Sequence, residues 1–268
     1  MEGRACLFRF SSVDRPEFCM VAYRISISEH HDRWHRYQSL AAGAAGLFLI
    51  FIMLGVMVMV ADRRAPAQHL PWRPLELANP IGLFTREKLV QAEGGVCRSV
   101  LAQGGVAYQD VEDQASGEFC TVRDGVRLTG GLASLRPAGA VMTCNQALAF
   151  SLWERQVVQT AAARHFGSAV TGIQHYGSYS CRRRYGAKDG PVSEHASANA
   201  LDIAAFTLAD GRKVSVEDHW SDAGEKGAFL REIRDGACDL FGVTLSPDYN
   251  AAHRDHLHLD MGQGGVCR

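Results

Sequence analysis

An uncharged apolar run of 21 residues, Ala41–Ala61, restricts the folds open to this chain more than any other feature. At about 1.5 Å per residue, a helix of this length crosses a hydrocarbon core of about 30 Å. Trp34 and Tyr37 precede the run and are expected at the level of the lipid headgroups. A buried core helix is the weaker alternative, because such helices rarely run so long without a polar face. We predict a transmembrane helix over residues 41–61.

A cleaved signal peptide is another interpretation of this run. It fits less well, because the run is longer than a typical apolar signal region and 40 residues precede it. Met20 is a possible later start, so residues 1–24 receive no interpretation of their own. Residues 1–40 are predicted to form a cytoplasmic N-terminal segment.

Cysteine placement indicates the orientation better than charge does. Arginines flank the run on both sides, so the positive-inside rule favours neither orientation. Two cysteines precede the run and six follow it, namely Cys97, Cys120, Cys144, Cys181, Cys238 and Cys267. An even set of six suits three disulfides in an oxidising compartment. Buried thiols are an alternative, while the lack of a Cys-x-x-Cys pair disfavours a cysteine zinc cluster. We predict a single-pass inner-membrane protein with its C-terminal domain in the periplasm.

The rest of the chain divides into a linker and two structured segments. Residues 62–80 contain four prolines and are predicted to be a linker. Residues 81–143 are a mixed segment, with a helix expected over Arg86–Gln103 and a hairpin around Asp124-Gly125. Residues 144–268 form the predicted C-terminal domain. The formal net charge of −1 gives no sign of nucleic-acid binding.

Within the C-terminal domain, helical and strand patterns alternate. Cys144–Phe166 has the spacing of an amphipathic helix, with Thr143 as its cap and Gly167 at its end. A second helix and three strands are expected over Gly227–Phe241, Ala200–Leu208, Arg212–Val216 and His256–Asp260. The fold class is therefore α+β, with helices packed on a small antiparallel sheet and one transmembrane helix before them.

Metal-ligating residue types are concentrated in two segments, Ser193–Ile203 and His253–Asp260. Side chains of a strand alternate between its faces, so Asp202 lies opposite its aliphatic neighbours. In the second segment one face collects His256, His258 and Asp260. If the two segments pair as strands, Asp202 and His258 reach one ion.

His195 then arrives from the loop before the first strand. Two imidazoles and one carboxylate, with a fourth position open, are the ligand set of a catalytic zinc ion. A single His-x-His or a lone aspartate is common by chance, but the combination of His195, Asp202 and His258 predicts a zinc site.

These residues resemble a known family. His195, six intervening residues, Asp202 and a later His-x-His are similar to the zinc D-Ala-D-Ala metallopeptidase, lysostaphin and hedgehog superfamily. The stretch from Cys144 to Arg268 resembles the bacterial extensin-like C-terminal domain family of that superfamily. The matching pieces are Gly177–Arg182, Ser193–Ala196, Asn199–Ile203, Phe229–Arg231, Gly236–Cys238, Pro247–Asn250 and His253–Asp260.

The resemblance implies a hedgehog- or DD-peptidase-like fold and a role for each site residue. His195, Asp202 and His258 match the zinc ligands. Asp255 matches the general base of the carboxypeptidase branch, and His256 matches that of the endopeptidase branch, so both stay open. Arg182 matches an arginine that stabilises the substrate carbonyl, although its place among three arginines also suits a solvated turn.

Two functions from different classes remain after the sequence analysis. One is a membrane-anchored hydrolase that cleaves peptidoglycan peptides of the cell wall with water activated by zinc. The other is a non-catalytic zinc-containing module for cell-wall binding or structure, which Asp260 would favour if it filled the fourth zinc position. A weaker reading is a membrane assembly protein acting through residues 81–140. The disulfides are expected to be Cys181 with Cys238, Cys144 with Cys267, and Cys97 with Cys120.

Overall fold

The computed structural model describes the backbone of residues 17–268 and the side chains of residues 33–268. The chain separates after Arg64 into two compact units. Predictions that concern residues 1–16 and the side chains of Cys19 and Arg24 lie outside the described residues, as does Cys6.

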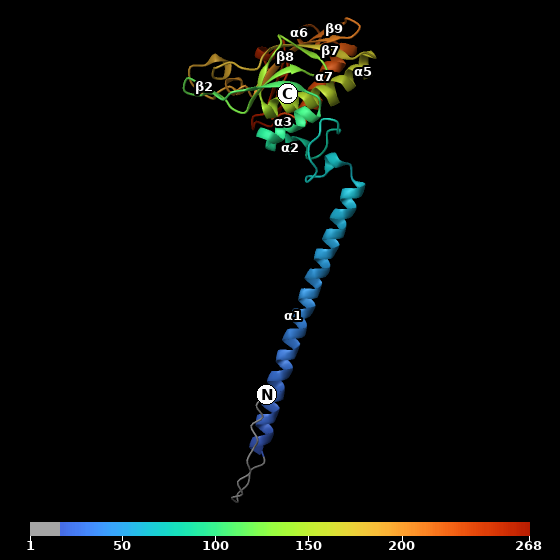
Figure 1. The fold of residues 1–268 in the computed structure, drawn as a ribbon, viewed down its shortest axis with the longest axis vertical. Coiled ribbons are helices and arrows are strands. Elements are labelled where there is room, and N and C mark those ends of the chain that lie inside the picture. The colour runs from blue at the N-terminus through green and yellow to red at the C-terminus, as the bar shows by residue number, and fades with distance from the viewer. Residues whose placement is uncertain (1–16) are drawn as a thin grey trace, which may run out of the picture. The chain divides into compact units, whose positions relative to one another are not determined.

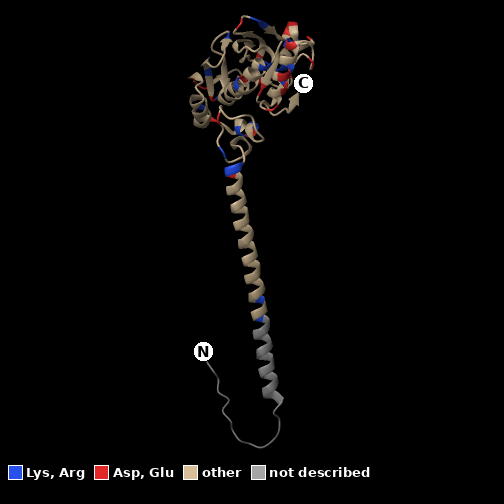
Figure 2. Ribbon diagram, turned by 90° about the vertical axis from the view of Figure 1, so that its right-hand side faces the viewer, with Lys and Arg blue, Asp and Glu red and all other residues tan. Residues whose placement is uncertain are grey.

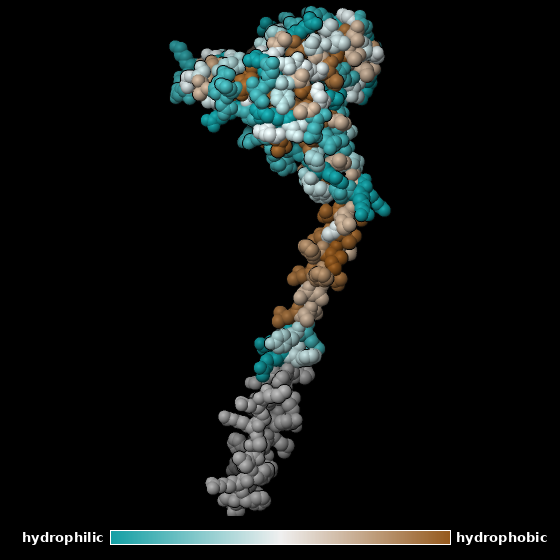
Figure 3. Space-filling view, viewed as in Figure 1, coloured by the Kyte–Doolittle hydropathy of each residue, from teal (hydrophilic) through white to brown (hydrophobic). Residues whose placement is uncertain are grey.

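The first unit contains one long helix, α1 (Glu17–Arg64). Its portion from Arg33 to Arg64 is long and apolar enough to cross a membrane, and none of its most apolar stretch is buried. Figure 3 shows this apolar band along the helix, and Figure 2 shows basic residues only at the band's two ends. A core helix would be covered by protein, so the structure favours a membrane span over that alternative.

The second unit, residues 65–268, is built on a seven-stranded sheet (Figure 1). Its order is β12-β10-β11-β8-β7-β5, with β9 paired to β8. The strands are β5 (Ser134–Arg136), β7 (Val170–Gly177), β8 (Ala200–Leu208), β9 (Lys213–Ser215), β10 (Val243–Leu245), β11 (Leu257–Asp260) and β12 (Val266–Cys267). All pairs are antiparallel except β5 with β7 and β10 with β12. The predicted α+β class is confirmed, with a sheet larger than expected and mixed at its edges.

Shorter strands and the helices complete this unit. A three-stranded sheet has the order β1-β4-β6, and β2 pairs with β3. These strands are β1 (Ala107–Val111), β2 (Gln114–Ser116), β3 (Cys120–Val122), β4 (Gly125–Gly130) and β6 (Val141–Thr143). The helices are α2 (Thr85–Gln91), α3 (Gly94–Gln103), α4 (Cys144–Trp153), α5 (Gln159–Phe166), α6 (Val216–His219) and α7 (Glu225–Cys238). Short 3-10 turns include η1 (Ala67–His69), η3 (Arg184–Gly186), η4 (Glu194–Ser197) and η5 (Ala251–His253).

The helix predicted over Arg86–Gln103 is two helices. Ala92 and Glu93 adopt extended conformations and separate α2 from α3, which begins at Gly94 with a φ of 53°. The helix predicted over Cys144–Phe166 is continuous from α4 through a π-helical turn, Glu154–Val158, into α5. Its predicted ends are confirmed, because the Thr143 side chain accepts from the Gln146 N–H and Gly167 is left-handed.

Helix α4 is buried on all sides, whereas α5 buries only Ala161 and Ala162, so the amphipathic pattern predicted over Cys144–Phe166 holds only in the second half of that helix. Trp153 packs on Phe206 of β8, with ring centroids 6.2 Å apart, and donates from its indole to the Ile233 carbonyl of α7. The disulfide between Cys97 and Cys144 ties α3 to the start of α4. A helix enclosed by a sheet and by other helices has no solvent face.

One hydrophobic core runs across residue 144, where the sequence predicted a domain boundary. Leu89 and Leu101, from α2 and α3, belong to the same buried cluster as Leu148 of α4. Leu77 from the predicted linker is buried in that cluster as well.

A bulge in β8 decides which of its residues face this core. The pairing with β7 steps from Gln174↔Ala205 to His175↔Ile203, which leaves Ala204 as an extra residue. A bulge of this kind reverses the alternation of side chains. The core residues of β8 are accordingly Leu201, Ile203, Phe206 and Leu208. Asp202 lies on the other face.

The hairpin predicted around Asp124-Gly125 was wrong. Asp124 does take the left-handed conformation of a tight turn, with φ at 50°. The strands on either side do not pair, because β3 pairs with β2 whereas β4 lies between β1 and β6. The turn therefore passes the chain from one sheet to another.

The number of disulfides was predicted correctly, but all three pairings were wrong. The bonds join Cys97 to Cys144, Cys120 to Cys181, and Cys238 to Cys267. Each joins elements that the fold brings together, with Cα atoms 6.1, 5.5 and 5.6 Å apart. Three disulfides fit a domain outside the cytoplasm.

Candidate metal centre

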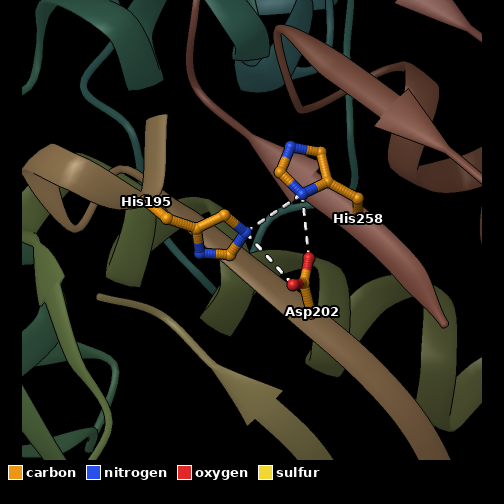
Figure 4. Close-up of side chains that lie close together, drawn as sticks. All are labelled: His195, Asp202 and His258. Carbon is orange, nitrogen blue, oxygen red and sulfur yellow. Dashed lines mark hydrogen bonds and ion pairs between the residues drawn. The ribbon is translucent and has the colours of Figure 1, made fainter. Parts of the chain in front are cut away.

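Three side chains from separate segments meet beside the paired strands β8 and β11 of the large sheet (Figure 4). His195 Nε2 lies 3.1 Å from Asp202 Oδ2 and 3.3 Å from His258 Nδ1. His258 Nδ1 lies 2.8 Å from Asp202 Oδ1. The sequence predicted this convergence, and the structure brings all three residues together.

Strand pairing sets two of these positions. Strands β8 and β11 are antiparallel, and their register places His258 directly opposite Asp202. Leu257 and Leu259 are fully buried on the other face of β11. Burying these aliphatic side chains holds the imidazole and the carboxylate on one side of the sheet.

His195 is placed by a short turn. It lies in η4, where the Ser193 side chain accepts from the His195 N–H. Ala198 follows in the left-handed conformation, and the chain then enters β8. This compact turn brings His195 back over Asp202.

Hydrogen bonds orient both imidazoles. His195 Nδ1 lies 3.2 Å from the Ser178 carbonyl, so it donates there and leaves the Nε2 lone pair facing the centre. His258 Nε2 lies 2.9 Å from Asp260 Oδ2, which leaves Nδ1 facing the centre. Asp260 is itself held by the Gly262 N–H, 2.8 Å from Oδ1. Metal-binding histidines are usually oriented in this way.

The electrostatics favour a positive charge at this point. Burial alone lowers the pKa of His258, but Asp202 and Asp260 on either side of the ring raise it to about 9. Burial alone raises the pKa of Asp202, but hydrogen bonds from His195 and His258 outweigh it and hold that pKa far below its usual range.

The donor set suits a small divalent cation, and the group of His195, Asp202 and His258 can hold one. In a tetrahedral zinc site with ligands at about 2.0–2.1 Å, neighbouring ligand atoms lie about 3.3 Å apart. The separations of 2.8, 3.1 and 3.3 Å are near that value. Two nitrogen lone pairs facing each other at 3.3 Å are also stable only around a cation or a shared proton.

The centre opens into a cleft of about 220 Å³ whose lining includes Arg182, His253 and His256. His256 Nε2 is 3.7 Å from Asp202 Oδ1, and its Nδ1 is 2.9 Å from Asp255 Oδ1. The three predicted catalytic residues therefore lie in or next to the cleft. Asp255 contacts the opposite side of the His256 ring from the metal group.

Two further histidines near the centre have defined partners. The Asn250 side-chain oxygen accepts from the Ala252 N–H and lies 2.8 Å from His253 Nδ1, so that nitrogen donates. Burial and the charges of His256 and His258 lower the pKa of His253 to about 4, which keeps it neutral. His175 lies 2.7 Å from the Pro137 carbonyl and has a structural role.

Sequence reasoning did not recognise the residues that orient the centre. Asp260 was considered only as a fourth ligand, although its place two residues after His258 puts both on one face of β11. The Ser178 carbonyl had no recognisable signal, because it reaches His195 only through chain folding. Asn250 caps the short turn η5 and contacts His253 locally, three residues along the chain.

The comparisons with known proteins give one result. A model of the family described as extensin-like protein C-terminus matches residues 95–268, well over half of the chain. Neither curated proteins nor solved structures yield a match.

Proposed function

The chain belongs to the extensin-like protein C-terminus family, and on that basis we propose that it is a membrane-anchored zinc peptidase that hydrolyses peptidoglycan peptides in the periplasm. The observation that carries the proposal is the group of His195, Asp202 and His258, whose donor atoms converge at the base of an open cleft. The proposal includes a fold of the hedgehog and D-Ala-D-Ala metallopeptidase type.

When bound, a zinc ion would polarise the scissile carbonyl and lower the pKa of a water molecule. His256 is placed to act as the general base, because its Nε2 lies next to Asp202 at the metal group. Asp255 accepts from the other ring nitrogen and so keeps the Nε2 lone pair directed at the centre. Between the two candidates, the geometry supports His256 as the base and Asp255 as the residue that positions it.

Arg182 supplies the remaining charge on the proposed reaction path. It is exposed, lines the cleft, and comes directly after the disulfide-bonded Cys181. A guanidinium at this position can donate to the oxyanion that develops as the peptide bond is attacked.

The alternative of a non-catalytic zinc module depends on the fourth ligand position. Asp260 does not compete for that position, because its carboxylate contacts His258 Nε2 on the far side of the ring from the centre. The open cleft in front of the metal group supports an enzyme.

Digestion of purified sacculi by the full chain in detergent micelles tests the proposal. We expect zinc-loaded protein to release muropeptides, chelation to stop the release, and added zinc to restore it. His256→Ala should lower the rate by about 10²–10⁴-fold while keeping its zinc. His219→Ala, on α6 outside the cleft lining, is the matched control and should keep both.

Two outcomes would contradict the proposal. Release that survives complete removal of metal would exclude zinc hydrolysis. Zinc-loaded protein that binds sacculi but releases nothing would instead support the non-catalytic module.

A further inference from the structure

The segment directly after α1 belongs to the folded unit. Helix α1 ends at Arg64 and η1 begins at Ala67, so the two residues Ala65 and Pro66 connect them. The Leu70 side chain, directly after η1, is buried. Because the connection is this short, the surface built around η1 stays near the membrane that α1 is proposed to span.

Polar contacts fix η1 and the residue after it against the start of α2, and Figure 1 shows the two segments side by side. The Leu83 N–H donates to His69 Nδ1 at 3.3 Å. Lys88 Nζ donates to the Leu70 carbonyl at 2.8 Å. The side chains of this surface are therefore held in place close to the proposed span.

Two large apolar side chains are exposed on this surface. Leu83 is 79% exposed, which is the largest value among the large hydrophobic side chains that the structure describes. Trp72, two residues after Leu70, is 50% exposed. Single apolar side chains are common on a soluble surface. A tryptophan and a leucine that adjoin the first turn after a span are instead typical of the lipid–water interface.

The charge around this surface also suits a membrane. From Arg63 to Val90 the chain carries five basic and two acidic residues. Basic residues next to a membrane are attracted to anionic lipid headgroups. Apolar side chains within a positively charged segment therefore match both parts of a lipid surface, the headgroups and the start of the acyl chains.

We propose that Trp72 and Leu83 form a second membrane contact, in which both side chains insert into the headgroup region of the bilayer that α1 spans. This inference rests on the membrane anchor of the proposed function and is independent of zinc hydrolysis. The bilayer is the partner because the short connection to α1 keeps this surface within its reach. The contact restricts how the folded unit, and the metal cleft with it, can turn on its anchor.

Quenching of Trp72 fluorescence tests this contact in the full chain. Protein with Trp34→Phe, which removes the tryptophan beside the apolar run, is placed in vesicles of phosphatidylethanolamine and phosphatidylglycerol, with or without brominated acyl chains. Trp153 and Trp220 are buried in the folded unit, so bromine in the lipid does not reach them. A protein that also carries Trp72→Phe gives their contribution. We expect brominated lipid to remove most of the Trp72 fluorescence.

Variants assign the contact to this surface. Leu83→Asp should abolish most of the quenching, because a carboxylate is costly to place among acyl chains, and Leu83→Ile should retain it. Leu132→Asp is the matched control and should retain it as well. Leu132 is 49% exposed and precedes β5, at the far edge of the large sheet from β10. Helix α2 lies near β10, since Arg86 donates to the Gly242 carbonyl directly before that strand.

The outcomes separate this contact from the function proposed above. Protein that does not float with the vesicles would reject the anchor and the contact together. Anchored protein whose Trp72 is not quenched, or is quenched equally in Leu83→Asp, would overturn the contact and leave the peptidase proposal standing. Quenching that depends on Leu83, in protein that releases no muropeptides from sacculi, would keep the contact and reject the peptidase. The thermal unfolding midpoint establishes that each variant is folded.

Discussion

Asp260 shows how a carboxylate outside the metal group can control one of its residues. It accepts from His258 Nε2 and is held in turn by the Gly262 N–H. Removing its charge leaves the imidazole less basic and less firmly oriented. Asp255 makes the equivalent contact to His256, which lies beside the centre without being one of the three residues that converge there.

These two contacts predict different effects for two similar substitutions. Asp260→Asn should weaken zinc binding by about 10–100-fold, because it acts on a ligand. Asp255→Asn should leave zinc affinity nearly unchanged and lower the rate of hydrolysis, because it acts on the base. Competition with a chromogenic chelator measures the affinity, and equal losses of affinity in both variants would contradict this division of roles.

Glu154 is a buried carboxylate remote from the metal centre. It lies at the start of the π-helical turn and accepts from the Ala133 N–H. Burial raises the pKa of its carboxyl, although hydrogen bonds from Ala133 and Leu132 oppose the rise. Because folding raises this pKa, the carboxyl loses its proton at a lower pH in the unfolded chain than in the folded protein. The free energy of unfolding therefore falls as the pH rises above roughly 4.3.

A pH series tests this linkage. As the pH rises from 4 to 7, the free energy of unfolding of the wild type should decline relative to that of Glu154→Gln, because the variant cannot ionise. The exposed Glu118→Gln should follow the wild type throughout. Denaturation followed by tryptophan fluorescence gives the values, and parallel profiles for wild type and Glu154→Gln would refute the assignment.

At the scale of elements, the π-helical turn and α7 approach each other closely. A Cβ built on Gly236 of α7 would lie 2.5 Å from Val157 Cγ1. The missing side chain therefore allows the two helices to pack at this separation. The same glycine is unfavourable for the helix itself, by about 1 kcal/mol relative to alanine.

Two glycine substitutions separate packing from helix propensity. Gly236→Ala should destabilise the protein by about 1–3 kcal/mol, because overpacking outweighs the gain in propensity. Gly95→Ala in α3 should instead stabilise it by up to about 1 kcal/mol, because nothing lies within 4 Å of the new Cβ. Urea denaturation measures both, and a stabilised Gly236→Ala would mean that α7 shifts freely.

At the scale of the whole molecule, the apolar helix indicates a membrane span, and the disulfides indicate an oxidising environment for the unit that follows it. Part of α1 can span a membrane, and six of the eight cysteines lie in disulfides of the unit that follows it. The predicted topology leaves Cys6 and Cys19 on the reducing side.

Protease accessibility and thiol labelling test this topology. In spheroplasts, added protease should digest residues 65–268, and a cytoplasmic marker should stay intact. Denatured, unreduced protein should react with a maleimide at two cysteines, and reduced protein at eight. A protected C-terminal unit, or eight reactive thiols without reduction, would place the domain in the cytoplasm.

The sequence by itself determined the features that depend on local patterns. An uncharged run of sufficient length predicts a spanning helix, and strand alternation around Asp202 and His258 predicts two faces of different chemistry. The helix ends at Thr143 and Gly167 follow from capping and from a left-handed glycine. The metal group was predicted because Asp202 and His258 occur on segments whose pattern predicts that they pair, and His195 occurs in the loop just before one of them.

Only the tertiary structure decided which distant segments became neighbours. Contacts between residues far apart in the sequence set the disulfide pairing and the burial of α4 on all sides. They also decide that β4 pairs with β1 and β6. No local pattern encodes such contacts. The same holds for the bulge at Ala204, which keeps Phe206 in the core while Asp202 faces the cleft. Local periodicity specifies which side of an element is apolar, whereas packing of the whole chain specifies what covers it.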